Sequence, residues 1–544
     1  MNAASAILGR LMQCVTLTIT IFLVASCSHG LSGKSDFSST IDSEAVVAAG
    51  AAAPEAASGF ADKPGWATRR FAVAAANPLA AQAGYQVLKA GGSAVDAAIA
   101  VQMVLTLVEP QSSGIGGGAF LLHHDGRTVE AFDGRETAPA GANGNLFVLP
   151  DGKPMPFADA VAGGRAVGVP GAVAMLEMAH RQHGRLPWAA LFEPAIRLAD
   201  EGFRVSPRLH TLLQAEQANA AARMNERARR YFFQPDGNPW PVGHRLQNPA
   251  LAEALRAIAR DGSRALKQGP IAQAMVDVVH QHPRNPGTLS LQDLASYQAL
   301  RREPLCFDHP APRARVCGFP PPSSGGLAVA QILGLLARTP AATLELEQGL
   351  PSAQWLHLYL EAARLAFADR AQYVADPAFV APPAPAGWQS LIAPTYLANR
   401  SRLIDTRPGA ASLQQAQPGQ PAALPLSHFA PMPSQPEYGT SHISIVDGQG
   451  NALAMTTTIE DQFGARQMVK GFLLKSGGFL LNNQLTDFSF LPQDAQGRPI
   501  ANRVQPGKRP RSSMAPTLVL DPTSGQVMMS LGIPGGAAII HYTA

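Results

Sequence analysis

Apolar residues between positions 77 and 108 follow a helical pattern that is interrupted once. Gly91-Gly92 breaks the run, and Ser93 then precedes a second apolar stretch over residues 94–108. Serine is favoured at helix N-caps, so we expect two helices with Ser93 at the start of the second. Almost every side of this second helix is apolar, which predicts that it is buried.

A different pattern begins at Thr440. Residues 440–446 and 452–460 alternate between apolar and polar side chains, and Asp447-Gly448 and Gly450-Asn451 lie between them. This pattern predicts a β-hairpin. The preceding segment, 407–438, carries seven prolines in 32 residues and almost no charge, which predicts a mobile linker without regular structure. A threonine therefore opens a strand directly after an irregular segment.

The glycine-rich loop at 114–119 matches a GxGxxA pattern. A dinucleotide site needs a strand before such a loop and a helix after it, whereas the order here is helix, loop, strand. A Rossmann site is therefore excluded. Residues 165–405 are expected to be mostly helical, with a strand pair around Cys306 and Cys317. Capping of the apolar helix that follows is the simplest role for Ser323 and Ser324.

The N-terminus has the pattern of an export signal. Arg10 precedes an apolar stretch at 11–26, which is shorter than the roughly 20 residues that span a bilayer. The sequence Val24-Ala25-Ser26-Cys27 resembles a lipobox, so residues 1–27 are interpreted as a signal peptide with Cys27 as the lipidated residue. An ordinary signal peptide or an uncleaved anchor is the alternative. Residues 28–65 then predict a flexible tether, and the expected location is the periplasm, tethered to the outer membrane.

Export implies an oxidising environment, in which cysteines form disulfides. Cys306 and Cys317 flank a proline-interrupted turn, so a disulfide between them is expected, with two free thiols as the alternative.

Composition excludes several classes of function. The 544 residues are 46% hydrophobic, enough for a large core. The net charge of +4 over this length gives no basic surface of the kind that binds nucleic acid. There is no HExxH, P-loop or GxSxG motif, and the histidine pairs 123–124 and 280/282 lack zinc-site spacing. We therefore expect no metal and interpret these histidines as hydrogen-bonding groups.

Cleavage between Gly439 and Thr440 would create a compact catalytic unit. The new α-amine, with a pKa near 8, could take the proton of the Thr440 hydroxyl, so that one residue supplies both nucleophile and base. Backbone N–H groups would then complete an oxyanion hole for acyl transfer. The downstream segments 482–488, 509–517 and 532–538 offer amides, a carboxylate, hydroxyls and a Gly-Gly loop for this purpose.

Eight motifs occur together in a single order: AGGSAVDAAIA, EPQSSGIGGGAF, FDGRETAPA, PPPSSGG, GTSHISIVDGQGNALAMTTTIEDQFG, LLNNQLTDFS, RPRSSMAPT and GIPGGAAII. In this combination the chain resembles the γ-glutamyltranspeptidases. The resemblance implies a mixed α/β, four-layer αββα sandwich of the N-terminal-nucleophile type, made as a precursor and cut into two subunits. It implies a large subunit over 66–439 and a small subunit over 440–544. It also implies γ-glutamyl transfer from glutathione-like amides to water, amino acids or peptides, without metal or organic cofactor.

The same resemblance assigns roles to particular residues. Thr440 matches the nucleophile and, with Gly439, the autocleavage site, and Thr458 matches the threonine that supports it. Arg135, Ser512 and Ser513 match the groups that hold the substrate α-carboxylate. Asp487, with Gln484 and Glu460, matches the group that binds the α-ammonium, and Gly535 and Gly536 match the oxyanion hole.

Family members continue beyond the PGG motif, so the small subunit is expected to be incomplete. Two alternatives stay open beside the hypothesis of a γ-glutamyl-transferring enzyme. One is an amidohydrolase of the same fold that acts on a glutaryl or cephalosporin side chain. The other is an inactive envelope lipoprotein.

Overall fold

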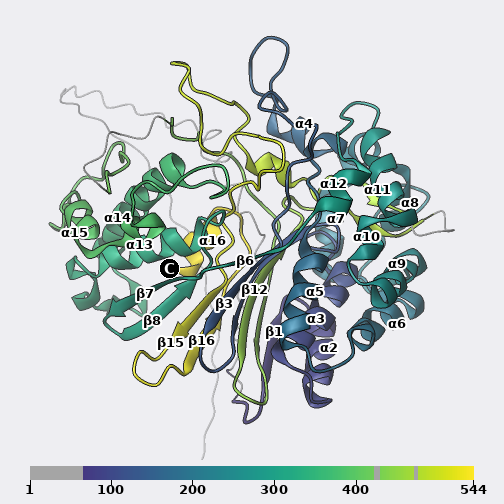
Figure 1. Cartoon of the computed structure of the whole chain (residues 1–544), viewed down its shortest axis with the longest axis horizontal. Coiled ribbons are helices and arrows are strands. Elements are labelled where there is room, and N and C mark those ends of the chain that lie inside the picture. The colour runs from purple at the N-terminus through teal and green to yellow at the C-terminus, as the bar shows by residue number, and fades with distance from the viewer. Residues whose placement is uncertain (1–64, 66, 422–428, 471–475) are drawn as a thin grey trace, which may run out of the picture. The chain divides into compact units, whose positions relative to one another are not determined.

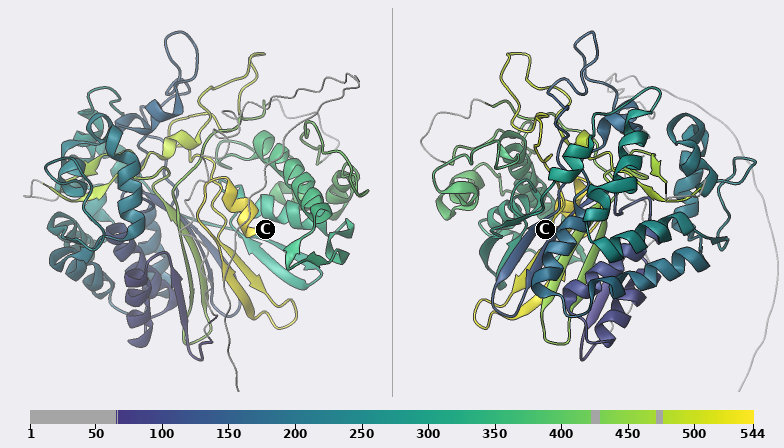
Figure 2. Two further views of the ribbon diagram at one scale, coloured as in Figure 1. Left: turned by 180° about the vertical axis from the view of Figure 1, so that it is seen from behind. Right: turned by 45° about the vertical axis from the view of Figure 1, so that its right-hand side comes forward.

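Two antiparallel β-sheets stack face to face at the centre of the fold, with helices on both outer faces (Figures 1 and 2). The computed structural model describes residues 65, 67–421, 429–470 and 476–544. The first sheet has the strand order β1-β11-β12-β2-β3-β6 and the second has the order β16-β15-β8-β7. Their bounds are β1 (Ala72–Ala75), β2 (Gly118–His124), β3 (Val129–Asp133), β6 (Leu300–Arg302), β7 (Leu305–Pro310), β8 (Arg313–Gly318), β11 (Ser441–Val446), β12 (Ala452–Thr458), β15 (Thr517–Leu520) and β16 (Val527–Leu531).

The first sheet is buried on both faces, because its side chains alternate between two cores. On β12, Leu453 and Met455 pack into the core with the first group of helices, whereas Ala452 and Ala454 pack with the second sheet and the helices beyond it. The first group includes α2 (Pro78–Lys89), α3 (Ala94–Val108), α5 (Ala172–His183), α6 (Glu193–Glu201), α7 (Pro207–Arg223), α8 (Glu226–Phe232), α9 (Pro249–Asp261), α10 (Arg264–Lys267), α11 (Gly269–His280) and α12 (Leu291–Ser296). The second comprises α13 (Gly325–Leu336), α14 (Ala353–Tyr373), α15 (Pro394–Ser401) and α16 (Ala538–Thr543). The layer order is therefore αββα, as expected from the sequence.

The two helices predicted at the start of the chain are present. The Ser93 side chain accepts a hydrogen bond from the Asp96 backbone N–H, and the Asp96 side chain accepts one from Ser93 in return, forming a capping box. All 15 residues of α3 are buried, which confirms the prediction from its apolar pattern. A backbone N–H at its start donates to the Asp447 carboxylate, so the turn of the β11–β12 hairpin is tied to this helix.

The predicted hairpin is also present, and it lies in the middle of the first sheet. Ser441 pairs with Thr457 across β11 and β12, which places Thr440 level with Thr458 on the neighbouring strand. The glycine loop runs alongside: a Cβ added to Gly117 would lie only 2.1 Å from the Thr458 carbonyl oxygen. The loop's glycines therefore allow close packing of backbone against the end of β12.

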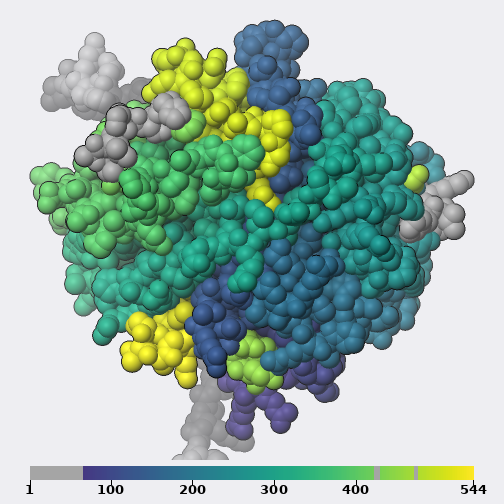
Figure 3. Space-filling model, viewed as in Figure 1, coloured from purple at the N-terminus to yellow at the C-terminus, as the bar shows by residue number. Residues whose placement is uncertain are grey.

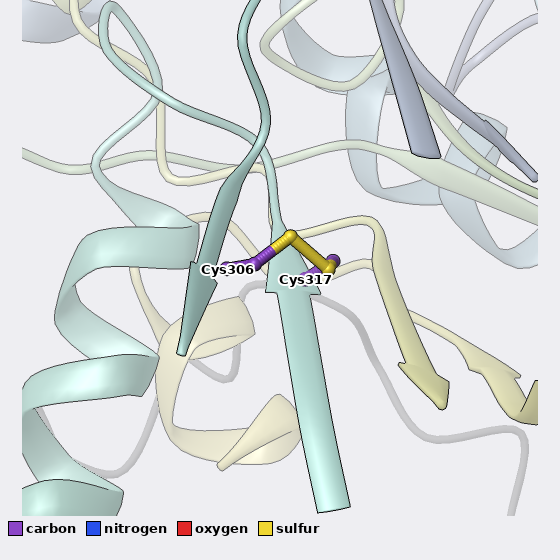
Figure 4. The surroundings of a disulfide bond; sticks show 2 residues. All are labelled: Cys306 and Cys317. Carbon is purple, nitrogen blue, oxygen red and sulfur yellow. A yellow bond between two sulfur atoms is a disulfide. The ribbon is translucent and has the colours of Figure 1, made fainter. Parts of the chain in front are cut away.

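A disulfide joins Cys306 on β7 to Cys317 on β8, directly across the strand pair (Figure 4). This confirms the pairing expected from the turn between the two cysteines. The bond lies in the second sheet, whose other two strands come from residues 517–531.

The described parts of the proline-rich segment contain neither helix nor strand, as predicted, but they are anchored to the fold. The Gly419 N–H donates to Asp369, the Gly419 carbonyl accepts from the Tyr373 hydroxyl, and Ala430 bridges to Ile500. Because these contacts fix the chain on both sides of residues 422–428, which lie outside the described residues, the expectation of a freely mobile linker is wrong for the described part.

Candidate active site

Thr440 lies at the start of a central strand, where its hydroxyl contacts the peptide bond that precedes it. The Thr440 Oγ1 donates to the carbonyl oxygen of Gly439 at 2.6 Å. Thr458 Oγ1 donates to the same oxygen, also at 2.6 Å, and accepts a hydrogen bond from the Glu460 N–H. Two hydroxyl groups therefore polarise the Gly439 carbonyl, and the pairing of β11 with β12 determines their position.

A pocket that is open to solvent lies beside this bond. Of the residues predicted for the site, all except Gly439 and Gly535 line it. The full lining is Arg135, Glu437, Tyr438, Thr440, Thr458, Glu460, Gln484, Asp487, Ser512, Ser513, Met514, Gly536 and Ile539. The structure thus brings together residues from six separate parts of the chain around the Gly439–Thr440 bond.

Arg135 follows β3 and is completely buried in the wall of the pocket. Its guanidinium donates to the backbone carbonyls of Pro510 and Arg511 at 3.1 and 2.8 Å, and it forms an ion pair with Asp487. Its Nη1 has no hydrogen-bond partner among the described residues. The wall of the pocket therefore holds a fixed cation, whose Nη1 lies 3.8 Å from a carboxylate oxygen of the buried Glu136.

The acidic side of the pocket is built from Asp487 and Glu460. Asp487 ends a short 3₁₀ turn and accepts a hydrogen bond from Gln484 at 2.8 Å. Burial raises the pKa of Asp487 to about 6, although Arg135 beside it acts in the opposite direction. Glu460 has φ +79°, a left-handed conformation uncommon for this residue, and its carboxylate accepts from Asn483 and Thr486. Burial and the neighbouring Asp487 raise the pKa of Glu460 well above its ordinary value.

Ser512 and Ser513 lie in a turn that is supported by the loop before α13. The Ser324 hydroxyl donates to the Ser512 carbonyl at 2.6 Å, and the Ser323 hydroxyl donates to the Met514 carbonyl at 2.5 Å. Ser323 does accept a hydrogen bond from the backbone N–H of Gly325, the first residue of α13, whereas the Ser324 side chain makes no cap hydrogen bond. Helix capping alone therefore does not account for the two serines. Both serines hold the Ser512–Ser513 turn in place, a role that the local sequence pattern could not reveal.

Gly535 and Gly536 lie just before α16, with φ values of +139° and +55°. Gly536 lines the pocket, and Gly535 is its neighbour in the chain. A Cβ added to Gly536 would lie 1.9 Å from the Glu437 carbonyl oxygen. A side chain at this position would therefore displace the segment that leads to Thr440.

No motif in the sequence indicated a role for Glu437 or Arg370 in the site. Arg370, on α14, donates to the Glu437 carboxylate at 2.7 Å and to the Ser513 hydroxyl at 2.6 Å, while Ser513 donates to Glu437. Burial alone would raise the pKa of Glu437, but Arg370 and Arg511 hold it below its ordinary value. The carboxylate of Glu437 therefore occupies the part of the pocket lined by Ser513 in the uncut chain.

Replacing Glu437 by glutamine is expected to destabilise the uncut chain by about 3 kcal/mol, because it leaves the buried Arg370 without its anionic partner. The measurement is thermal and denaturant unfolding of E437Q in a Thr440→Ala background, which keeps the chain uncut. The exposed Glu347 supplies the matched control, E347Q. Equal stability of E437Q and E347Q would contradict the role assigned to the ion pair.

Above the pocket, segment 490–504 lies beside residues 140–160, as Figures 1 and 3 show for the yellow and blue loops. The rings of Phe147 and Phe490 stack with centroids 4.4 Å apart, and Phe157 lies 6.0 Å from the Tyr438 ring. Segment 490–504 therefore packs against residues 140–160, and Phe157 in that stretch lies against the ring of Tyr438, two residues before Thr440.

An αββα sandwich with a threonine at the start of a central strand defines an N-terminal-nucleophile amidohydrolase. Comparison with known proteins identifies the family. A protein-family sequence model described as Gamma-glutamyltranspeptidase matches residues 80–544 of this chain. The glutathione hydrolase proenzyme of Bacillus subtilis is 35% identical over 475 residues, covering 86% of this chain and 75% of that protein. The chain therefore belongs to the γ-glutamyltranspeptidase family of enzymes.

Two solved structures extend the comparison. The γ-glutamyltranspeptidase of Helicobacter pylori is 29% identical with a TM-score of 0.60, covering 66% of this chain and 99% of that one. The cephalosporin acylase of Bacillus halodurans is 26% identical with a TM-score of 0.68, covering 88% and 81%. The same fold is thus found in proteins named for two different substrates.

Proposed function

We propose that this protein cleaves the γ-glutamyl amide bond of glutathione and related compounds through an acyl-enzyme on Thr440. The observation that carries the proposal is the placement of Arg135 and Asp487 in one pocket with Thr440. A free amino-acid end carries one negative and one positive charge, and Arg135 and Asp487 match them. The ion pair between these two residues would open to admit the substrate's carboxylate and ammonium.

Activation begins with the Gly439–Thr440 bond. The Thr440 oxygen adds to the Gly439 carbonyl carbon, the C–N bond breaks, and the nitrogen takes the hydroxyl proton, which converts the amide into an ester. Water then hydrolyses the ester and leaves a free α-amine on Thr440. Thr458, whose hydroxyl donates to the Gly439 carbonyl, stabilises the negative charge that develops on that oxygen.

Turnover repeats the same chemistry on the substrate. The α-amine of Thr440 accepts the hydroxyl proton while the oxygen attacks the γ-carbonyl, and the leaving amine receives the proton. Backbone N–H groups of Gly535 and Gly536 would hold the oxyanion. Water, an amino acid or a peptide then takes the γ-glutamyl group. Cleavage also releases the segment ending in Gly439, so the Glu437 carboxylate can leave the pocket to the substrate, with Ser512 and Ser513 holding the substrate carboxylate.

The proposal is tested with two anilide donors that differ only in the α-amino group. γ-Glutamyl anilide should be turned over with a kcat/KM about 10³-fold above that of glutaryl anilide, because the glutaryl group leaves the buried Asp487 unpaired. α-Glutamyl anilide serves as the control for the position of the scissile bond. Equal or better turnover of the glutaryl donor would contradict the proposal.

An acylase acting on a glutaryl or cephalosporin side chain is the second candidate, and the likeness to the Bacillus halodurans structure favours it. A glutaryl side chain lacks the α-ammonium group. Glu460, Gln484 and Asp487 would then have no charged ligand, although all three line the pocket. The two carboxylates of Glu460 and Asp487 therefore favour a γ-glutamyl donor, which carries an ammonium group, over a glutaryl donor, which does not. The complete lining likewise argues against the inactive envelope protein.

The proposed location is the periplasm, with the chain tethered to the outer membrane through Cys27. Signal residues 1–27 and nearly all of the tether, 28–65, lie outside the described residues. In the part of the chain that the structure describes, no helix has both the length and the apolar character needed to span a bilayer. The proposed subunits are 66–439 and 440–544, produced from one precursor.

A further inference from the structure

Two histidines and a glutamate meet between the first sheet and the helices that cover it, away from the pocket. His123 lies on β2, Glu130 directly opposite it on β3, and His183 is the last residue of α5. One potential ligand atom from each lies within 4.8 Å of the other two. We propose that His123, Glu130 and His183 form a binding site for a divalent transition-metal ion, with zinc as the best match.

The strand pairing explains how the cluster arises. His123 and Glu130 are cross-strand partners, and His123 is on the same face of β2 as Ala119 and Leu121, which pack against the helices. Helix α5 ends over that face, so the His183 ring lies 4.1 Å from the His123 ring between centroids. No sequence spacing rule could detect these ligands, because one comes from across a hairpin and one from a helix about 60 residues later.

The His123 side chain is buried with both ring nitrogens unsatisfied among the described residues. Its exposed fraction is only 1%. Leaving a buried polar group unsatisfied is costly, whereas coordination to a metal ion would satisfy one nitrogen. The expectation that this histidine makes a hydrogen bond within the core is therefore wrong.

The other two groups complete a typical donor set. His183 Nε2 already contacts Glu130 Oε2, and Arg301 pairs with the second Glu130 oxygen. Arg301 would therefore hold the carboxylate from outside while Oε2 binds the ion, as carboxylate ligands are commonly held by further hydrogen bonds. Two imidazoles, one carboxylate and a water match the preferred tetrahedral coordination of zinc.

The site is separate from the proposed chemistry at Thr440. Gly118 pairs with Thr458 at the pocket end of β2, and His123 is five residues further along the strand. At about 3.3 Å per residue, the cluster lies roughly 16 Å from that end. Metal binding should therefore stabilise the packing of α5 on the sheet without entering the reaction.

The test uses the full chain, free of histidine tags and stripped with a chelator, titrated with zinc chloride in a calorimeter. One equivalent of zinc should bind and raise the melting temperature. His123→Phe, which preserves an aromatic ring in the core, should weaken zinc binding by about 100-fold or more. Glu130→Gln should also weaken it. His280→Ala, at an exposed histidine on α11, is the matched control and should bind like the parent.

Absence of zinc binding to the parent chain would overturn the proposal and leave His183 and Glu130 as a hydrogen-bonded pair. Equal zinc affinity in the parent and His123→Phe would also overturn it, because the bound ion would then lie elsewhere. Cobalt absorption in the visible range should report tetrahedral coordination in the parent and disappear in His123→Phe. These readouts do not depend on enzymatic turnover.

Discussion

Replacing Thr440 by alanine is expected to abolish both chain cleavage and turnover. The Thr440 hydroxyl contacts the Gly439 carbonyl oxygen at 2.6 Å and is the group proposed to attack its carbon. Without that hydroxyl no ester forms, no α-amine is released, and kcat should fall by at least about 10⁴-fold. The measurements are gel analysis of the purified chain and hydrolysis of γ-glutamyl anilide.

Thr440→Ser is the matched control, because it keeps the hydroxyl and removes only a methyl group. It should still cleave and still turn over substrate. Thr458→Ala should slow cleavage while leaving the Thr440 nucleophile present, since it removes the second hydroxyl on the Gly439 carbonyl. Cleavage of Thr440→Ala at the same bond and at the parent rate would contradict the proposed mechanism.

Neutralising Asp487 is expected to reduce kcat/KM for γ-glutamyl anilide by about 10²- to 10³-fold, the effect of removing one partner of a buried charge pair. The substrate ammonium would lose its anionic partner. Asp487→Asn preserves the shape of the side chain and should not reduce turnover of the glutaryl donor, because it removes the carboxylate that this donor leaves unpaired. Arg135→Lys should also reduce γ-glutamyl turnover, because the lysine ammonium group cannot make the bidentate hydrogen bonds of a guanidinium group.

The pH dependence gives a second readout for the same residue. Burial raises the pKa of Asp487 to about 6, so below that pH the group is protonated and carries no charge for the ammonium. The kcat/KM for γ-glutamyl anilide should therefore fall as the pH drops through about 6. Protonation of the Thr440 α-amine, whose pKa lies near 8, contributes an acid limb of its own, so only the component near pH 6 should disappear in Asp487→Asn. A parent-like limb in that variant would assign the titration to another group.

The local patterns in the sequence predicted the elements around the nucleophile. The capping serine before α3, the alternation in β11 and β12, and the turn at Asp447 each determine structure through neighbouring residues. The second sheet is different, because β15 pairs with β8 across about 200 residues of chain. Such pairing depends on the packing of the whole fold rather than on any local pattern.

The residues of the candidate site also fall into two groups, those that local motifs predicted and those that only the folded structure revealed. Motifs located the residues that line the pocket, including Arg135 and Asp487. They did not reveal Glu437, Arg370 or the roles of Ser323 and Ser324, because these side chains act through contacts between distant segments. The cluster of His123, Glu130 and His183 was missed for the same reason.

The most direct measurement is the intact mass and N-terminal sequence of the signal-free protein after incubation at neutral pH, followed by assay of the same sample with γ-glutamyl anilide. We predict two fragments, the smaller beginning Thr-Ser-His-Ile, and turnover that rises in step with their appearance. A single uncut chain, or a cut at any other bond, would contradict activation at Thr440.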